Sequence, residues 1–374
     1  MFLVGNDKKV VEVENAKFYV DENSKIAELL PCTFYVDANG KIAELLCDDT
    51  YLMFTSMASS DDYTLRNMYK TFDGVNWEVT PCSQWITSTG SEALIYGDGK
   101  ILMYDHANDG TDYCYLSEDD GETWTKYSIG QDVSRITYYN GYFFASGRTK
   151  YKAYSTDGKT WTTFSSNNYA TFWLDGAYNK WFSLQKNSSS STTSYLQAFS
   201  LPNTTNIANA LAGTGDTSSN GTMIYGNGYL VTCVMSASSD FRYWVDNGEN
   251  GGSLTKIITA SNFKSYNVVY GNGNFIVYGN TGYYKSTDGT PLTLTTLTSK
   301  TWASVDVVTG AMFFKDRFVS LDLGSGTANM KLQYSTDGIT WTKTNTGILV
   351  SSNYSLPLKH AATMNKDGRY DHEI

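Results

Sequence analysis

Short runs of apolar residues alternate with tight polar turns along most of this 374-residue chain. Runs such as residues 101–104 (ILMY) and 275–278 (FIVY) are rich in the aromatic and β-branched residues that favour strands. Each run follows a turn built on Gly, Asn or Asp, and almost no segment has the 3.6-residue period of an amphipathic helix. The pattern predicts an all-β protein of short antiparallel strands.

One kind of turn, which lies between two apolar strands, recurs at a regular distance. It occurs seven times, roughly 44 residues apart, at residues 48–49, 97–99, 140–141, 179–180, 226–228, 271–273 and 315–316. A period of this size is typical of β-propeller blades, each of which is a four-stranded sheet. The spacing predicts a seven-bladed β-propeller over residues 42–347.

A second motif lies between the third and fourth strands of the units. Its fullest copy reads SEDDGETW (residues 117–124), and shorter copies keep a hydroxyl residue, Asp, Gly and Trp in that order. In such a turn the Asp and Ser oxygens accept backbone N–H groups, Gly takes the positive-φ position, and the Trp packs from the next strand. We assign a structural role to the motif residues Asp73, Trp77, Asp119, Trp124, Asp157, Trp161, Asp246, Asp288, Asp337 and Trp341.

Three units depart from this motif. The copy at Asp288 has Leu292 where the Trp is expected, and the copy at Asp246 is eroded. The unit that contains Trp181 has no copy, and we expect a different turn near residues 201–203.

The pattern S-x-D-x-G-x-T-W resembles the Asp box, or BNR repeat, of sialidase-like β-propellers. The resemblance covers most of residues 42–346 and implies a propeller with Asp-box turns. It also implies, for enzymes of that family, three arginines that hold the substrate carboxylate, a Tyr nucleophile assisted by a Glu, and an Asp acid/base. None of the six arginines lies in the Phe/Tyr-Arg-Ile-Pro motif expected in the first blade: Arg66, Arg135, Arg148, Arg242, Arg317 and Arg369. We therefore expect no catalytic residue and no enzyme, with a sialidase-like glycoside hydrolase as the alternative.

The N-terminal region is organised differently from the repeats. Residues 18–30 and 34–46 are a duplication with a period of 16 that matches at 11 of 13 positions. Each copy reads as strand, turn, strand, and Asn39-Gly40 is a strong hairpin signal. We expect residues 1–41 to form a β-hairpin appendage that either docks another protein or caps the propeller. Residues 348–374 show no repeat and are expected to form a C-terminal tail.

Composition excludes several classes of partner. The net charge of −10 argues against nucleic acid, which requires a basic face. No apolar run approaches the roughly 18 residues of a transmembrane helix, and the first residues lack the basic region of a secretory signal. The five cysteines include no C-x-x-C pair, and the three histidines are scattered. We expect no metal site, no cofactor and no membrane insertion.

Binding is expected on the face opposite the motif turns. If the strands of a unit are labelled A to D, the A–B and C–D turns share one face, and the B–C and D–A connections share the other. The latter connections vary in length, and variable loops on a rigid scaffold usually carry binding. Because sugar rings stack on aromatic side chains, we take Tyr63 and Trp85 as candidate ligand contacts, together with His106.

These features together suggest a biological setting. A scaffold of a sugar-binding type without a secretion signal, an acidic surface rich in Tyr, Ser, Thr and Asn, and a duplicated hairpin all fit a bacteriophage virion protein. We expect an exposed tail or fibre component, made in the host cytoplasm, within an oligomeric assembly. Its hairpins would join other virion proteins, and its loop face would bind a host-surface glycan or receptor. The further alternative is a bacterial surface or scaffold protein that binds other proteins.

Overall fold

The structure is a computed structural model that describes residues 32–36, 42–47, 51–57, 66–82, 93–106, 112–119, 121–130, 133–147, 152–163, 171–177, 180–186, 193–202, 206–214, 221–234, 238–245, 253–261, 263, 265–279, 281–299, 308–322, 330–348 and 362–364. Within these ranges the regular elements are strands joined by turns, apart from one short 3-10 helix, η1 (Pro291–Thr293). The strands form seven four-stranded sheets and one two-stranded sheet.

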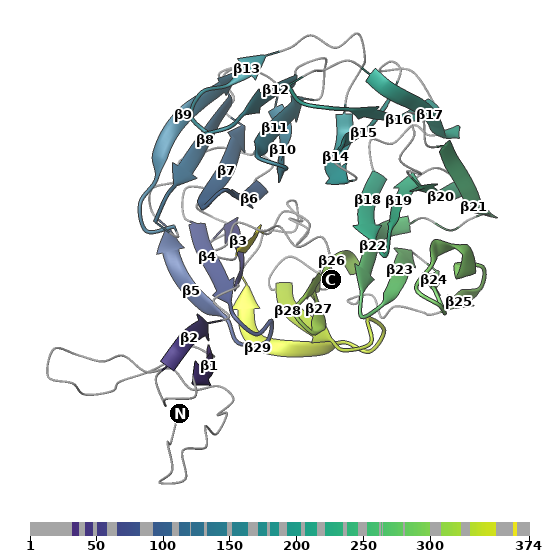
Figure 1. Cartoon of the computed structure of the whole chain (residues 1–374). Coiled ribbons are helices and arrows are strands. Elements are labelled where there is room, and N and C mark those ends of the chain that lie inside the picture. The colour runs from purple at the N-terminus through teal and green to yellow at the C-terminus, as the bar shows by residue number, and fades with distance from the viewer. Residues whose placement is uncertain are drawn as a thin grey trace, which may run out of the picture.

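The seven four-stranded sheets are blades arranged around a ring (Figure 1). Blade 1 contains β3 (Tyr51–Met57), β4 (Arg66–Thr71), β5 (Glu78–Cys82) and β30 (Ala362–Met364); blade 2 contains β6 (Ala93–Gly97), β7 (Lys100–His106), β8 (Asp112–Ser117) and β9 (Thr125–Gly130); blade 3 contains β10 (Val133–Tyr139), β11 (Tyr142–Gly147), β12 (Lys152–Ser155) and β13 (Thr162–Thr163).

Blades 4 to 7 continue in chain order around the ring. Blade 4 contains β14 (Thr171–Ala177), β15 (Lys180–Lys186), β16 (Thr193–Phe199) and β17 (Asn206–Thr214); blade 5 contains β18 (Gly221–Gly226), β19 (Tyr229–Val234), β20 (Ser238–Val245) and β21 (Ser253–Ser261); blade 6 contains β22 (Ser265–Gly271), β23 (Asn274–Gly279), β24 (Gly282–Lys285) and β25 (Leu297–Ser299); blade 7 contains β26 (Val308–Phe314), β27 (Arg317–Asp322), β28 (Met330–Ser335) and β29 (Thr342–Ile348). The all-β propeller predicted from the sequence is confirmed.

The turn between the first two strands of a blade explains why the repeat can be recognised in the sequence. In four blades both central residues of this turn have positive φ, as in Asn227 (46°) with Gly228 (76°) and Asn272 (49°) with Gly273 (72°). Positive φ at both positions is the geometry of a type I′ turn, which Asn-Gly and Asp-Gly favour. These dipeptides therefore fix the register of each inner hairpin.

Blade 1 corrects the sequence analysis at the ring closure. The turn at residues 48–49 was expected to join the first two strands of blade 1, but β2 (Ile42–Cys47) pairs with β1 (Cys32–Val36) and forms the separate two-stranded sheet. Pairing across the short segment 37–41 loses little chain entropy. The inner position of blade 1 is filled by β30, from the expected tail, which pairs with Tyr51–Met53 of β3. The first copy of the duplication, residues 18–30, lies outside the described residues.

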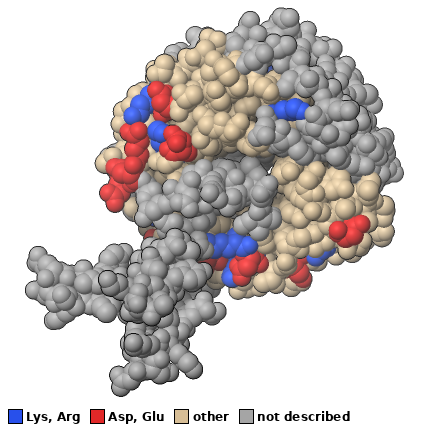
Figure 2. All heavy atoms as spheres, viewed as in Figure 1, with Lys and Arg blue, Asp and Glu red and all other residues tan. Residues whose placement is uncertain are grey.

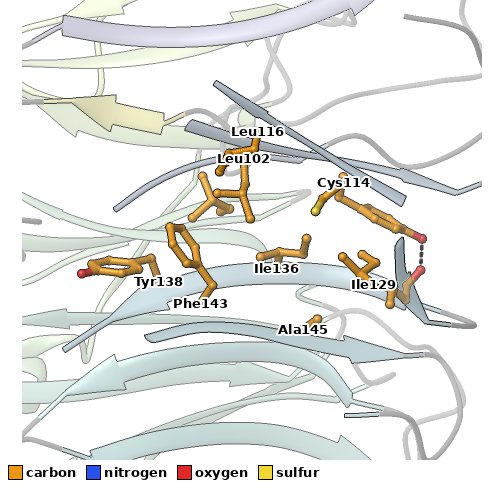
Figure 3. Close-up of a cluster of buried hydrophobic side chains, with 11 residues drawn as sticks. Leu102, Cys114, Leu116, Ile129, Ile136, Tyr138, Phe143 and Ala145 are labelled. Atoms are coloured by element: carbon orange, nitrogen blue, oxygen red, sulfur yellow. Dashed lines mark hydrogen bonds between the residues drawn. The ribbon is translucent and has the colours of Figure 1, made fainter. Parts of the chain in front are cut away.

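The hydrophobic core lies between neighbouring blades. Between blades 2 and 3, Leu102, Cys114 and Leu116 pack against side chains of β10 and β11, including Ile136 and Phe143 (Figure 3). Burying each large apolar side chain contributes about 1.5–3 kcal/mol. A hydrogen bond from the Tyr104 hydroxyl to the Val133 carbonyl, dashed in Figure 3, joins the two blades within this cluster.

Glycine allows the inner strands to approach closely. A Cβ atom on Gly97, at the end of β6, would lie 2.1 Å from Cγ of Tyr138 in the next blade. The same arrangement recurs between Gly226 and Tyr270, and between Gly271 and Phe313. An aromatic ring of one blade therefore occupies the space that a side chain at the glycine would need.

Candidate functional site

The Asp-Gly turns between the third and fourth strands of blades 1, 2, 3 and 7 share one hydrogen-bond pattern. In blade 7, Gly338 N–H donates to Ser335 Oγ (2.9 Å), and the Ser335 hydroxyl donates to Asp337 Oδ1 (2.9 Å). Asp337 Oδ1 also accepts the backbone N–H groups of Ile339 and Thr340, each at 2.7 Å. The turns of Asp73, Asp119 and Asp157 repeat this pattern with one or two backbone donors to the carboxylate.

These hydrogen bonds set the charge state of the turns. Partial burial raises the pKa of Asp337, but the donors from Thr340, Ile339 and Ser335 outweigh it and lower the pKa to about 2. In Asp119, which is exposed, the Thr123 hydroxyl and N–H donors lower the pKa directly. The pKa values of Asp73 and Asp157 are lowered by their backbone donors against the opposing effect of burial. These four carboxylates are therefore charged at neutral pH.

Three of the turn tryptophans pack on the clusters between blades. Trp124 donates Nε1–H to the Gly121 carbonyl (2.9 Å) and packs on the cluster between blades 1 and 2. Trp161 packs on the cluster between blades 2 and 3, and Trp341 packs on the cluster between blades 6 and 7. Each of these side chains is half-buried, and so is Trp77. Trp124, Trp161 and Trp341 therefore pack between neighbouring blades, and the structural role of the full motif stays a prediction.

Blade 6 departs from the pattern at the position of the Trp. Leu292, which occupies the place where the Trp is expected in the sequence, is 53% exposed. Leu294, two residues further along, is fully buried in the core of blades 5 and 6. The 3-10 helix η1 causes this offset, because it inserts a turn between Asp288 and the next strand. Asp288 instead accepts from Thr290 and from the Thr293 hydroxyl.

The turns also connect one blade to the next on this face, which we call the turn face. Asn227 Nδ2 donates to the Gly289 carbonyl (2.8 Å), and the buried Tyr278 hydroxyl donates to the Gly338 carbonyl (2.8 Å). Lys159 and Glu118 form an ion pair of 2.9 Å between the turns of blades 3 and 2. Among the coloured residues of Figure 2, several acidic side chains lie beside basic ones. The polar groups named here are thus engaged within the protein.

Arg317 begins β27 of blade 7, directly after the turn at residues 315–316. Its Nε and Nη2 atoms donate to the two carboxylate oxygens of Asp316, at 2.8 and 3.0 Å. Hydrogen bonds to Asp316 raise the pKa of Arg317, and the nearby charge of Asp73 adds to the effect. Its methylene groups lie against Gly74 of blade 1. Arg317 therefore closes the seam between the last blade and the first.

The opposite face, which we call the loop face, carries the segments between the second and third strands and between blades. Described strands end before segments of six to ten residues that lie outside the described residues, among them 58–65, 83–92, 215–220, 300–307 and 323–329. Tyr63 and Trp85, two of the three candidate ligand contacts, lie outside the described residues, as does Asp246. His106 ends β7, where its backbone is opposite Asp112 of β8. The end of β7 and the start of β8 therefore lie side by side at the loop face.

Two buried polar side chains were missed in the sequence. Lys152 of β12 is 2% exposed, and its Nζ lies 5.9 Å from the centre of the Phe199 ring in blade 4. Burial lowers the pKa of Lys152 to about 8. Cys114 is a free, buried thiol that donates to the Gly158 carbonyl (3.5 Å), and burial raises its pKa to about 12. Nearly every position of β8 and β12 is buried, so no alternation along either strand signals these two side chains.

Among the described residues, no group of three or more His, Cys, Asp or Glu side chains is arranged to hold a metal ion. In the same part of the chain, no helix has the length and hydropathy needed to cross a membrane.

No protein-family model matches the chain, and no curated protein matches it either. Solved β-propellers are similar in fold. The WD40 β-propeller domain of Doa1 is 13% identical, with 73% of this chain and 86% of that chain covered and a TM-score of 0.49. The dihydro-heme d1 dehydrogenase NirN is 11% identical over 86% of this chain and 71% of that chain (TM-score 0.49), and YCF48 bound to D1 peptide is 14% identical over 72% and 92% (TM-score 0.45). Similarity at this level carries no information about function.

Proposed function

We propose that this β-propeller is a non-enzymatic binding protein of a bacteriophage virion, exposed on the tail or a fibre. Its loop face binds a host-surface glycan or protein receptor, and its N-terminal hairpins attach it to other virion proteins. The turns of blades 1, 2, 3, 6 and 7 are Asp boxes in this reading.

The observation that carries this proposal is the difference between the two faces. On the turn face, the carboxylates and hydroxyls of four turns are occupied by bonds within the turn, as Asp337 illustrates. The segments between strands on the loop face reach ten residues, as between β5 and β6 at 83–92. Function on a rigid scaffold concentrates in such variable loops.

The electrostatics of the turn face support the absence of catalysis. A general acid at neutral pH needs a raised carboxyl pKa, as in glycosidases. The pKa values of the turn carboxylates are lowered instead, with that of Asp337 at about 2. Arg317 is held by both oxygens of Asp316 and packs on Gly74, so its guanidinium is already engaged.

The test is binding of purified protein to a glycan panel and to intact bacterial cells, with the variants Trp85→Ala and Tyr63→Ala. We expect saturable binding that either substitution weakens at least tenfold, because removal of a stacking ring in a sugar site costs on the order of 1–3 kcal/mol. The matched control is Leu292→Ala, which removes an exposed apolar side chain from the turn face.

The possible results separate the candidate functions. Loss of binding in Leu292→Ala but not in the loop variants would overturn the assignment of the loop face. Turnover of any glycan in the panel would overturn the non-enzymatic reading and favour a sialidase-like hydrolase. Binding only to a host protein that is absent from virus particles would favour a bacterial scaffold protein.

A further inference from the structure

The outermost strands of blades 4 and 5 differ from those of the other blades. β17 and β21 have nine residues each, whereas the outer strands of the other five blades have two to seven. An edge strand presents a row of unpaired backbone N–H and C=O groups, and proteins usually keep such edges short or charged. β17 has no charged residue, and β21 has one, Lys256.

These two edges form one region of the rim. β17 and β21 lie beside each other, because blades 4 and 5 are neighbours in the ring (Figure 1). Within the described residues, β17 pairs with β16, β21 pairs with β20, and no strand adds to the outer side of either. This region is therefore the longest strand edge on the propeller that is open to another strand.

The N-terminal hairpin is a second open strand surface. β1 and β2 pair with each other and belong to no blade. A two-stranded hairpin is only marginally stable alone and gains stability when a third strand is added. Residues 48–50 join it to β3, so it lies beside blade 1, across the ring from blades 4 and 5 (Figure 1).

We propose that the β1–β2 hairpin of one copy adds to the outer edge of β21 in a second copy, so that the protein self-associates head to tail. Backbone hydrogen bonds supply the affinity in this kind of strand addition. The charges agree, because β21 carries Lys256 alone and the hairpin strands carry Glu44 alone. Because the two surfaces lie on opposite sides of the ring, the contact is heterologous, and it forms an open chain or a closed ring of copies.

The proposal predicts that each copy has one donor surface and one acceptor surface. Phe34→Pro removes a backbone donor from the middle of β1 and disables the hairpin. Thr255→Lys with Thr259→Lys adds two charges to β21 and blocks the edge. Each full-length variant is then a monomer, but a one-to-one mixture forms a complex of two chains, because each variant keeps one working surface.

Sedimentation velocity over a wide range of protein concentration measures these outcomes. The wild-type mass is expected to increase with concentration, and amide hydrogen exchange in β21 is expected to slow at least tenfold in concentrated protein. Two controls should keep the association. Phe34→Tyr preserves the backbone of β1. Thr125→Lys with Ser128→Lys adds the same charge at two exposed positions of β9.

Three results would overturn the proposal: a wild-type chain that is monomeric at every concentration, a mixture of the two variants that does not associate, or loss of association in the β9 control. Near-native circular dichroism and thermal midpoints establish that the variants are folded. The proposal does not depend on what the loop face binds, so its failure leaves the binding assigned to that face unaffected. It makes the partner of the N-terminal hairpin a second copy of this chain, in place of a different virion protein.

Discussion

Two contacts between blades each pack an aromatic ring over a glycine, but with the two residues in opposite blades. They are the contact between blades 2 and 3 and the contact between blades 3 and 4. In the first, the glycine lies in the earlier blade and the ring in the later one, since a Cβ on Gly97 would lie 2.1 Å from Cγ of Tyr138. In the second, Tyr139 of the earlier blade packs over Gly176 of the later one, where a Cβ would lie 1.9 Å from the Tyr139 ring. The strand registers show that the ring and the glycine have exchanged places.

The other buried side chains also differ between the two contacts. The first contact is largely aliphatic, with Leu102, Leu116 and Ile136, and the Gly158 turn lies against it. The second is a cluster of aromatic rings around Phe144, Trp181 and Phe199, and Leu201 packs on it. These two contacts therefore each preserve one ring and one glycine, but not a residue type at a fixed position.

The largest effect should come from breaking that exchange. Gly176→Tyr places a second ring where Tyr139 already lies, and we expect it to lower the free energy of unfolding by more than about 4 kcal/mol. Tyr139→Gly alone leaves a cavity that costs about 3 kcal/mol. The double variant restores one ring and one glycine and should recover most of the loss. Denaturant titration of the three variants gives the coupling energy, and strictly additive losses would contradict the comparison.

A smaller loss is expected at the contact between blades 2 and 3. Gly97→Ala places a methyl group against the Tyr138 ring and should cost about 2–3 kcal/mol. Gly99→Ala is the matched control, because no atom lies within 4 Å of its added methyl group and only its φ of 70° opposes the change. The control should cost about 1 kcal/mol. Because Gly97 has no positive φ, a loss in thermal unfolding no larger than that of the control would contradict the packing argument.

The contact between blades 3 and 4 should also have its own pH dependence. The folded protein lowers the pKa of Lys152 to about 8, from 10.5 in the unfolded chain. Between these values the unfolded state binds more protons, so stability rises with pH by at most about 3 kcal/mol. Lys152→Met should flatten that part of the curve of unfolding free energy against pH. An unchanged slope would mean that other groups, such as tyrosines, account for it.

Acid should affect the contact between blades 2 and 3 more than the next one. The lowered pKa of Asp157 contributes stability that is present above its usual value of 3.8 and is lost as the pH falls through its folded value. The blade 4 turn at Leu201 and Pro202 has no carboxylate to titrate. Asp157→Asn keeps an acceptor oxygen and should cost less than about 1 kcal/mol at neutral pH while reducing acid sensitivity. As the pH decreases, amide hydrogen exchange should detect opening of the blade 3 turn before opening of the blade 4 turn.

The smallest effect is expected for the exposed ion pair between Lys159 and Glu118. Exposed pairs of this kind contribute little, and salt screens them. Lys159→Ala should leave the thermal midpoint within experimental error, in low or high salt. A clear loss would give this pair a larger part in joining blades 2 and 3 than its exposure suggests.

Local features were predictable from the sequence, and distant ones were not. The turn of Asp157 can be predicted because its hydrogen-bond partners, Ser155, Lys159 and Thr160, lie within three residues of it. Type I′ turns can be predicted because they too depend on adjacent residues. Leu294 was missed because the helix η1 shifts the buried position by two residues from Leu292, which a fixed spacing cannot anticipate.

The closing strand and the ring exchange were beyond such reasoning. Residues 362–364 (ATM) have no periodic pattern, and their partners are Tyr51–Met53 at the other end of the propeller. Tyr139 and Gly176 become complementary only when two blades meet, so neither residue signals it alone. The ligand candidates Tyr63 and Trp85 stay predictions, since both lie outside the described residues.

The strand β30 also determines the order in which the protein is completed during synthesis. β3 leaves the ribosome first among the strands of the ring, and its partner β30 leaves last. Until then, the inner side of β3 at Tyr51–Met53 is an open edge on a nascent chain, where it can pair wrongly with a neighbouring polypeptide. Ring closure also joins residues at the greatest sequence separation in the fold, which makes it a slow step. Conditions that slow translation or crowd nascent chains should therefore reduce the yield of soluble protein before they affect its finished stability.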